Sequence, residues 1–458
     1  MIFSKQELSE IFNQNIKHDI SGICVNSKDV KNGDLFIALK GEKLDGHEFV
    51  KEALDNGAAM AIVERKINNI HGEKLIAVDS SYDALLKLAG YNLKHVRAKY
   101  ICVTGSVGKT TTKNMLYHIL SQQSSMTYST MKNFNSRIGL PICAAMMPRD
   151  TKIGIFEMGM TEKGHINKLT EIINPSIAVI TTIGEAHLGS GSFDSVFDIA
   201  RAKSEIFENG AEFAIIPSDS PYFDFLKDKA LSCGIKNVLS FGFNEKSDAK
   251  IISCCYSEKG IKVQAKILEK TTDYEIQTNN KALAINSIAS ILAAHVASGI
   301  EIENLAKLLN SFVATSGRGE TVYIKNRSII VIDDSYNASP ASMKAGIRSL
   351  YRYTNCRKIA VIGDMKELGS DSVHFHENLS PTIDKYGIDL VFACGNLMKY
   401  LYDNLSEHKK GSWREISSEL AEDVLSEIKD GDCILVKGSN SMSMNFIVDA
   451  IKNKFLDG

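Results

Sequence analysis

Several features that define special classes of protein are missing from this sequence. No Cys-x-x-Cys pair occurs among the nine cysteines, and an odd number does not suit a closed disulfide framework, so we expect a reducing compartment. No uninterrupted apolar run approaches the roughly 18 residues of a membrane span. The first residues also lack the basic and then apolar segments of a secretory signal. The sequence therefore predicts a cytoplasmic protein with no membrane span.

An excess of charge of one sign is missing as well. Lysine and arginine (53) nearly balance aspartate and glutamate (55), which gives a formal net charge of -2. A nucleic-acid-binding protein is expected to carry a basic face. We therefore expect no nucleic-acid partner and favour small-molecule chemistry.

What the sequence does have is enough chain for several ordinary globular domains. Its 458 residues are 44% hydrophobic and 24% charged, and at roughly 150 residues per domain they would form about three domains. Changes in the rhythm of the apolar runs put the boundaries near residues 96 and 315. The expected domains cover residues 1–95, 96–314 and 315–458.

Short, continuous apolar runs alternate with helix-like stretches along the chain. Such runs suit strands buried on both faces, and their alternation with helices predicts parallel βαβ units and an α/β fold. A polar, mixed region at 245–280 and an alanine-rich helix over 281–298 separate two groups of strands. Ligands bind beyond the carboxyl ends of strands in open parallel sheets, so the ends of these runs are candidate sites. The runs lie at 100–104, 154–157, 177–181, 328–333, 358–363, 390–394 and 433–437.

A glycine-rich loop between an expected strand and an expected helix is the strongest chemical signal. Glycines let backbone N–H groups turn toward phosphate oxygens, and a helix start adds positive potential. A lysine can neutralise the phosphates and a threonine hydroxyl can bind Mg²⁺. The usual pattern has a further glycine where this chain has Val103. Strand, loop and helix nevertheless follow in the required order, so we expect phosphate binding by Gly105, Ser106, Gly108, Lys109, Thr110 and Thr111.

Two further polar residues follow apolar runs at the same expected sheet edge. Glu157 ends one run, and His187 comes shortly after the run that ends at Thr181. A carboxylate and an imidazole could share Mg²⁺ with nucleotide phosphates there. Taken singly, a capping carboxylate and a surface histidine are the favoured interpretations.

Lys203 lies on the apolar face of an expected helix. Ile199, Ile206 and Phe207 stand at offsets of -4, +3 and +4 from it. Burying an ammonium is costly, and desolvation lowers the pKa of a lysine. The side chain could extend to solvent, pair with a carboxylate or be chemically modified, and the spacing alone favours the first two.

Polar residues near the junction of the two strand groups are candidates for nucleotide binding. Asn286 lies on the alanine-rich helix away from its apolar stripe, and Arg318 lies in a glycine-containing junction from which it could reach across a cleft. Asp333 follows a buried run and could bind ribose hydroxyls, while Tyr336 and Asn337 offer a stacking face and an amide. A solvated helix face and a surface arginine are the competing interpretations for the first two.

In their order and spacing, these motifs resemble the ATP-dependent Mur ligases of peptidoglycan synthesis. The resemblance covers essentially the whole chain. Three stretches are similar to the branch that joins D-alanyl-D-alanine to a UDP-N-acetylmuramoyl-tripeptide: 33–41 with 45–47, 333–338, and 363–369 with His376. Within the family pattern, Asn26-Ser27-Lys28 stands in place of Asp-Ser-Arg, and Ser136 stands in place of a third asparagine. The motifs that carry the resemblance are 104–112, 157–159, His187, 202–207, Asn286, 317–318 and 333–340.

The resemblance implies a fold, two cofactors and a set of roles. A small α/β N-terminal domain would hold the UDP-sugar, a central phosphate-loop domain with a parallel sheet would bind ATP, and a Rossmann-like C-terminal domain would close over the site. Catalytic roles fall on Lys109, Lys203, His187 and Arg318, and nucleotide contacts on Asn286, Arg318, Asp333, Tyr336 and Asn337. Mg²⁺, as two ions, would be held by Thr110, Glu157, His187 and a carbamylated Lys203. Substrate contacts fall on Ser27, Lys40, Gly41, Asp45, His47, Asn133 and Asn135.

The implied reaction is an ADP-forming ligation through an acyl phosphate, carried out by a monomer. The third residue of the tripeptide, meso-diaminopimelate or lysine, stays open, as does the role of Lys437. Two alternatives also stay open. One is a related Mur or folylpolyglutamate-type ligase with a different acceptor, and the other is a nucleotide-hydrolysing switch that controls a partner.

Overall fold

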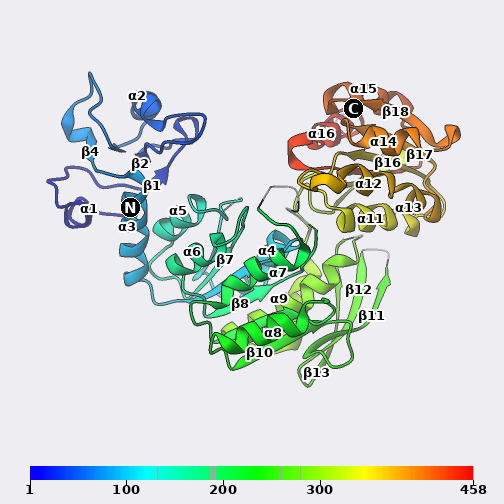
Figure 1. Ribbon diagram of the computed structural model, residues 1–458, viewed down its shortest axis with the longest axis horizontal. Coiled ribbons are helices and arrows are strands. Elements are labelled where there is room, and N and C mark those ends of the chain that lie inside the picture. Colours follow the sequence, from blue (N-terminus) through cyan, green and yellow to red (C-terminus); the bar gives the residue numbers. More distant parts are fainter. Residues whose placement is uncertain (132, 186–187, 189–191, 258–259, 279, 457–458) are drawn as a thin grey trace.

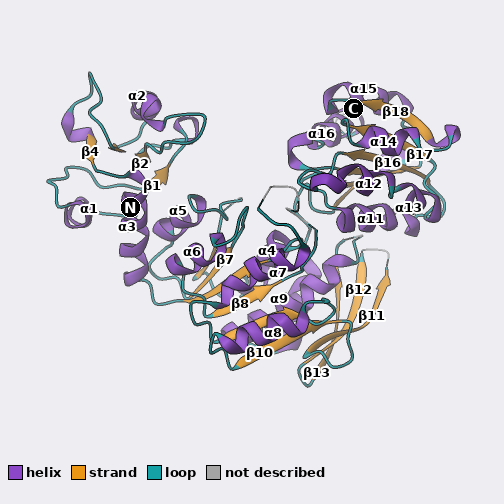
Figure 2. Cartoon of the chain, viewed as in Figure 1, coloured by secondary structure: helices purple, strands orange, loops and turns teal. Residues whose placement is uncertain are grey.

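Three β-sheets, one after another along the chain, organise the molecule. The computed structural model describes all residues except 132, 186–187, 189–191, 258–259, 279 and 457–458. The first and last sheets lie at opposite ends of the molecule, with the largest sheet between them (Figure 1). The expected α/β fold is confirmed, with helices flanking each sheet (Figure 2).

The first sheet has four parallel strands in the order β1-β2-β3-β4. Its apolar strands β2 and β3 are buried along their whole length. The helix α3 that follows is the longest of this part and leads into the central sheet. The strands are β1 (Gly22–Cys24), β2 (Asp34–Ile37), β3 (Met60–Val63) and β4 (Leu75–Ala77), and the helices are α1 (Lys5–Phe12), α2 (Val50–Asp55) and α3 (Ser81–His95).

The central sheet has nine strands in the order β13-β12-β11-β10-β9-β8-β5-β7-β6. Strands β5 to β11 run parallel, and β12 and β13 add an antiparallel edge. The strands are β5 (Lys99–Thr104), β6 (Thr127–Ser129), β7 (Ile153–Glu157), β8 (Ile177–Ile180), β9 (Phe213–Pro217), β10 (Asn237–Gly242), β11 (Ala249–Tyr256), β12 (Ile261–Ile267) and β13 (Lys270–Ile276). The helices are α4 (Lys109–Ser121), α5 (Gly139–Met146), α6 (His165–Ile172), α7 (Val196–Ser204), α8 (Phe223–Ser232), α9 (Ala282–Ser298) and α10 (Ile302–Leu308).

The third sheet has six strands in the order β14-β15-β19-β16-β17-β18, and only β14 is antiparallel to its neighbour. Strand β19 is the last in sequence but lies between β15 and β16, so polar residues at the ends of these three strands are neighbours. The strands are β14 (Glu320–Ile324), β15 (Ile329–Asp334), β16 (Arg357–Gly363), β17 (Leu390–Cys394), β18 (Lys410–Arg414) and β19 (Asp432–Lys437). The helices are α11 (Pro340–Ser349), α12 (Ser372–Glu377), α13 (Ser380–Lys385), α14 (Met398–Asp403), α15 (Ser417–Glu427) and α16 (Asn445–Phe455).

The polar, mixed region expected at 245–280 contains the three strands β11, β12 and β13. In β12, Ile261, Val263, Ala265 and Ile267 are buried, while the residues between them are not. This alternation with a period of two is typical of an antiparallel strand with one solvated face. The apolar content of the region is therefore divided between two faces, so it does not form the continuous runs that mark the buried parallel strands.

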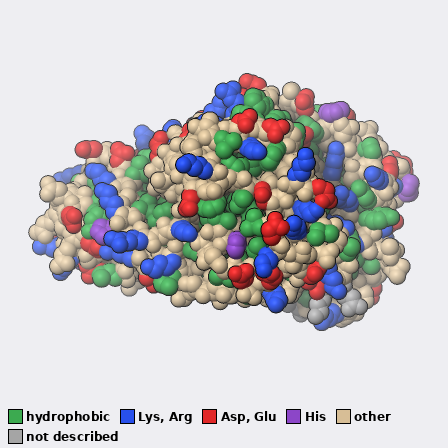
Figure 3. Space-filling model, turned by 90° about the horizontal axis from the view of Figure 1, so that it is seen from below, with side chains coloured by type: hydrophobic (Ala, Val, Ile, Leu, Met, Phe, Trp, Pro, Cys, Tyr) green, Lys and Arg blue, Asp and Glu red, His purple; other side chains and the backbone are tan. Residues whose placement is uncertain are grey.

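The described helices and surface carry no sign of a membrane span. None of the described helices combines the length and the apolar composition that crossing a bilayer requires. Acidic and basic side chains are interspersed over the face seen in Figure 3. This mixture agrees with the small formal net charge of the whole chain.

Candidate active site at the phosphate loop

The loop between β5 and α4 has the backbone of a phosphate-binding turn. Gly105 and Gly108 have φ angles of +148° and +91°, which favour glycine. A Cβ on Gly108 would lie 2.7 Å from Oδ1 of Asn286, so this close approach also requires glycine. Helix α4 begins directly after this turn and has no side-chain cap on its N-terminal N–H groups. Such a helix start can accept an anion.

Lys109 starts α4 and folds back over the loop. Its Nζ donates hydrogen bonds to the carbonyl oxygens of Gly105 (2.6 Å) and Ser106 (3.4 Å). Burial lowers the pKa of Lys109, the charge of Glu157 raises it, and the charge of Arg318 lowers it. The Lys109 side chain is therefore bonded to the phosphate loop, and the charges of Glu157 and Arg318 act on it with opposite sign.

Glu157, at the end of β7, gathers polar residues from two other segments. Its Oε2 accepts a hydrogen bond from the Thr110 hydroxyl (2.7 Å), and its Oε1 accepts one from Nδ2 of Asn135 (2.7 Å). The sequence predicted Thr110 and Glu157 as metal ligands but predicted Asn135 only as a substrate contact. The hydrogen bond to Glu157 instead links Asn135 to the two expected metal ligands.

The residues around Glu157 fit Mg²⁺. The Thr110 hydroxyl and the Glu157 carboxylate are adjacent oxygen donors beside the phosphate loop, and Mg²⁺ in such sites takes one or two carboxylates together with substrate phosphates. Among the residues that the structure describes, no cluster of three or more His, Cys, Asp or Glu side chains could hold a metal by itself. His187, the other expected ligand, lies outside the described residues.

Lys203 is buried as an isolated amine on α7. Its side chain is 1% exposed, and it forms no hydrogen bond or ion pair with another described residue. Its expected apolar neighbours in sequence, Ile199, Ile206 and Phe207, are buried as well. Burial and then the nearby charge of Lys109 hold the pKa of Lys203 well below its usual value. Burial at this position therefore disfavours the charged form of the amine.

Arg318 lies at the junction with the C-terminal part, on the face of an aromatic ring. Its Cζ is 3.8 Å from the centre of the Tyr336 ring, a cation–π contact. Its charge lowers the pKa of both Lys109 and Lys113. Tyr336 thus contacts Arg318, and the charge of Arg318 acts on two lysines of helix α4.

Asp333 is buried and fully engaged within the protein. Its carboxylate accepts hydrogen bonds from the Ser316 hydroxyl (2.9 Å), the Gly317 N–H (2.7 Å), and the N–H (3.2 Å) and hydroxyl (2.5 Å) of Ser335. In this structure it fastens the segment just before Arg318 to the end of β15. The sequence predicted a ribose contact for Asp333, and this internal role was not expected.

The other expected nucleotide contacts have varied surroundings. Ser106 exchanges hydrogen bonds with the backbone of Gly184, both at 3.0 Å, and Thr111 is buried in the first turn of α4. Asn286 is buried against Gly108, where the sequence alone left a solvated face open. Asn337 bonds through Oδ1 to the next N–H, of Ala338, at 2.9 Å.

The expected substrate residues of the N-terminal part form local networks. His47 is held by Oδ1 of Asp45, 2.6 Å from Nδ1, and by the N–H of Glu64, 2.9 Å from Nε2. Because Nε2 accepts a hydrogen bond, the proton lies on Nδ1. Lys40 forms a β-bridge with Asp45. The Ser27 hydroxyl bonds to Glu52 at 2.9 Å, and the Gly41 N–H bonds to the Leu44 carbonyl oxygen at 2.9 Å. Asn133, an expected substrate residue of the central part, is exposed.

Several residues at the site were missed from the sequence. The hydroxyls of Thr181 and Thr182 bond to Val107 in the phosphate loop, and the buried Lys113 donates to the Thr130 carbonyl at 2.9 Å. The two threonines directly follow strand β8, a neighbour of β5, and polar residues in that position are a recognisable signal. Lys113 is one turn beyond Lys109, and its sequence context gave no comparable signal.

The comparisons with known proteins agree with this geometry. Family models match three segments: the Mur ligase family catalytic domain over residues 19–91, the Mur ligase middle domain over 103–294, and the Mur ligase glutamate ligase domain over 317–440. A relative from Rickettsia prowazekii (strain Madrid E), named UDP-N-acetylmuramoyl-tripeptide--D-alanyl-D-alanine ligase, is 37% identical over 98% of this chain and 99% of its own length.

Solved structures agree as well. A crystal structure of MurF from Acinetobacter baumannii has a TM-score of 0.86 at 27% identity and covers 98% of this chain and 99% of that one. MurF ligase from Thermotoga maritima in complex with ADP has a TM-score of 0.79 at 30% identity and covers 95% and 98%. Since the family models cover most of the sequence and a relative matches over nearly its full length, the chain belongs to the Mur ligase family.

Proposed function

We propose that this chain is an ATP-dependent, ADP-forming ligase that adds D-alanyl-D-alanine to a UDP-N-acetylmuramoyl-tripeptide during cytoplasmic peptidoglycan precursor synthesis. The observation that carries the proposal is the 37% identity to a ligase of that name over 98% of this chain. The electrostatics support it, because the charge of Arg318, on the C-terminal side, lowers the pKa of Lys109 in the phosphate loop. The terminal phosphate of a bound triphosphate would then contact Lys109 of the central part and Arg318 of the C-terminal part.

ATP would be bound with its phosphates on the loop at residues 104–112. Lys109, the N-terminal N–H groups of α4 and Arg318 would neutralise the charge of the transferred phosphoryl group. Asn286 beside Gly108, together with Asp333, Tyr336 and Asn337, would bind the nucleoside. For Asp333 to reach a ribose, it would have to exchange at least one internal hydrogen bond for a ligand hydroxyl.

Thr110 and Glu157 would hold one Mg²⁺ ion, which supplies charge neutralisation at the phosphates when bound. We assign a second ion to His187 and to a carbamate on Lys203. The neutral Lys203 amine can attack CO₂, forming an N–C bond and releasing one proton to solvent. The product is an anion in place of a buried cation, and the low pKa of Lys203 favours the amine that this step needs.

The chemistry requires that a carboxylate, a weak electrophile, gain a leaving group. A carboxylate oxygen of the tripeptide would attack the γ-phosphorus, the bond to the bridging oxygen would break, and ADP would leave. The neutral amine of D-alanyl-D-alanine would then attack the carbonyl carbon of the acyl phosphate, losing a proton as phosphate leaves and the amide forms. The protein contributes mostly orientation, charge neutralisation and exclusion of water.

We assign the three substrates to three domains, over residues 1–95, 96–314 and 315–458. The first would bind the UDP-sugar through Ser27, Lys40, Gly41, Asp45 and His47. The second would bind ATP, with Asn133 and Asn135 near the tripeptide end. The third would receive the dipeptide, and the whole would act as a monomer.

The proposal is tested by offering purified protein UDP-muramoyl tripeptides, ATP, Mg²⁺ and D-alanyl-D-alanine, with product analysis by mass spectrometry. We expect the pentapeptide and one ADP for each amide formed. Tripeptides ending in meso-diaminopimelate and in lysine are compared, and other amino acids replace the dipeptide in parallel. Preference for another acceptor would favour a related ligase, and ATP hydrolysis without any acceptor would favour the switch.

Lys203→Ala tests the role assigned to the carbamate. Turnover should fall by about 100-fold or more, because a metal-binding anion is lost from the reacting centre. Short carboxylic acids should restore part of it by occupying the vacated space. Turnover like that of the unaltered protein would remove Lys203 from the mechanism.

A further inference from the structure

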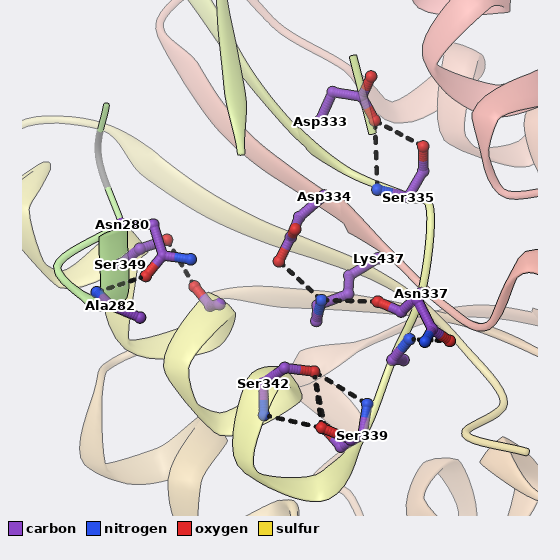
Figure 4. A network of polar contacts seen from close by, with 12 residues as sticks. Asn280, Ala282, Asp333, Asp334, Ser335, Asn337, Ser339, Ser342, Ser349 and Lys437 are labelled. Carbon is purple, nitrogen blue, oxygen red and sulfur yellow. Dashed lines mark hydrogen bonds and ion pairs between the residues drawn. The ribbon is translucent and has the colours of Figure 1, made fainter. Parts of the chain in front are cut away.

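The adjacent residues Asp333 and Asp334 end strand β15 and have different partners. Successive side chains of a strand point to opposite faces. Asp333 binds the segment before Arg318 at Ser316 and Gly317. Asp334 instead binds Lys437, as Figure 4 shows. The end of this strand is therefore hydrogen-bonded on one side to the junction at residues 316–317 and on the other side to the end of strand β19.

Lys437 is a buried cation at the end of β19. Its side chain is 2% exposed, and its Nζ donates to Oδ2 of Asp334 (2.7 Å) and to the carbonyl oxygen of Asn337 (2.8 Å) (Figure 4). A Cβ on Gly346 of α11 would lie 3.1 Å from Cδ of Lys437, so the helix packs closely on the lysine stem. Buried ion pairs are often no more stabilising than apolar residues of similar volume. A contribution to the stability of the fold is therefore not enough to explain why Lys437 and Asp334 form a buried ion pair here.

The two partners of Lys437 stand on either side of the segment 335–336. This segment is also bound to the junction, because the Tyr336 N–H donates to the Gly317 carbonyl oxygen at 3.0 Å. The Tyr336 ring then lies 3.8 Å from Cζ of Arg318. Lys437 is bonded to Asp334 and Asn337, and Tyr336 lies between these two residues in the chain. The Tyr336 ring in turn contacts Arg318, so Lys437 is linked to Arg318 through this segment.

We propose that Lys437 is a positioning residue for Arg318: by holding Asp334 and the Asn337 carbonyl, it fixes Tyr336, whose ring holds the Arg318 guanidinium in place. The role assigned to Arg318 rests on the proposed function. Among the described residues, the hydrogen-bond partners of Lys437 lie outside the phosphate loop, so Lys437 acts only through this chain of contacts. Losing it should therefore weaken the binding of the triphosphate without removing any group that touches it.

The test is a double-mutant cycle with Lys437→Met and Arg318→Ala, measured by calorimetric titration with a non-hydrolysable ATP analogue and Mg²⁺. Lys437→Met alone should raise the dissociation constant by about tenfold, and in the Arg318→Ala background by less than about twofold. Additive effects, or no effect of Lys437→Met, would overturn the proposal. In assays the change should appear mainly in KM for ATP, with kcat reduced less.

A matched control separates positioning from a loss of stability. Arg357 and Asp432 form another ion pair of the same sheet (2.8 Å) at the opposite end of β19, so Arg357→Met breaks a comparable pair away from the junction. It should leave binding of the analogue unchanged. If Lys437→Met fails to fold, the cycle is repeated with Lys437→Met/Asp334→Leu, which removes both buried charges. That variant should fold and still bind the analogue weakly, whereas full affinity would overturn the proposal.

The cycle also separates this inference from the proposed function. Binding of the nucleotide analogue is measured without either peptide substrate. If the protein does not join D-alanyl-D-alanine but the cycle is non-additive, the proposed function is overturned and the role of Lys437 is retained. If the protein joins D-alanyl-D-alanine but the cycle is additive, the proposed function is retained and the role of Lys437 is overturned.

Discussion

The central part of the chain is joined to its two neighbours in different ways. On the N-terminal side, one hydrophobic core continues across the junction and includes residues of α3, such as Leu88, together with Leu140 and Phe156 of the central part. On the C-terminal side, the two hydrophobic cores contain only residues after 319, so no buried apolar cluster of the described residues crosses the junction.

Polar contacts across the two junctions differ as well. Asn92 of α3 is buried, and its Nδ2 donates to the carbonyl oxygens of Ala144 (2.9 Å) and Met147 (2.8 Å) at the end of α5. At the other junction, Arg352 donates to the Ser257 carbonyl oxygen at 3.0 Å and lies 4.8 Å from the Tyr256 ring. A cavity of about 550 Å³ lies beside this contact, lined by residues of both parts, among them Tyr256 and Arg348.

The different contacts at the two junctions indicate which junction can open. Separating the first two parts would expose a shared apolar core, which costs about 25 cal/mol for each Å². Separating the last two would break hydrogen bonds and cation–π contacts that water can partly replace. Domain closure around a nucleotide is therefore expected on the C-terminal side, where Arg318 is attached.

The largest effect should come from Leu88→Ala in the shared core. Truncating a buried leucine costs about 2–5 kcal/mol of unfolding free energy, and here the loss should speed amide hydrogen exchange in both the N-terminal and central parts. Leu401→Ala, a buried leucine of α14, is the matched control and should affect only the C-terminal part. Faster exchange confined to residues 1–95 in Leu88→Ala would contradict a shared core.

A smaller loss is expected for Asn92→Ala. The carbonyl oxygens of Ala144 and Met147 would lose buried donors, and an unsatisfied buried group costs about 1–3 kcal/mol. Urea unfolding measures the change. Asn237→Ala is the control, because Asn237 makes an exposed bond to the Glu212 carbonyl oxygen, and its removal should change stability by less than about 0.5 kcal/mol. Equal losses in the two variants would show that Asn92 adds nothing to this junction.

The smallest change in stability is expected for Arg352→Ala at the C-terminal junction. Its contacts with Ser257 and Tyr256 are polar and partly solvated, so the free energy of unfolding should fall by less than about 1 kcal/mol. The radius of gyration from small-angle scattering should increase, because the two parts separate more readily. Arg327→Ala removes an ion pair and a ring contact within the C-terminal part and should leave the radius unchanged. A loss above about 2 kcal/mol for Arg352→Ala would contradict the comparison.

Much of the candidate site could be predicted because its signals are local. The glycines, Lys109 and Thr110 follow a strand within a few residues, and this spacing alone fixes their position at the start of α4. Glu157 ends an apolar run, and a parallel sheet brings strand ends to one edge. The hydrophobic surroundings of Lys203 were readable from helical periodicity, which also explains the low pKa found there.

Other features depend on which distant segments meet, and local patterns do not contain this information. Asn135 was assigned to substrate, yet it bonds to Glu157, 22 residues away. Asp333 and Asp334 are indistinguishable as a sequence pair, but one binds the junction and the other binds Lys437, 103 residues further along.

The sequence by itself determined the α/β architecture, the phosphate loop and the set of chemically competent side chains, because periodicity and turn chemistry act over a few residues. Only the tertiary structure decided that the first junction shares a core while the second does not, and that Lys437 lies between β15 and β16 beside Asp334. Strand order and core continuity are set by the packing of whole elements, and contacts between residues a hundred positions apart arise only when that packing is complete.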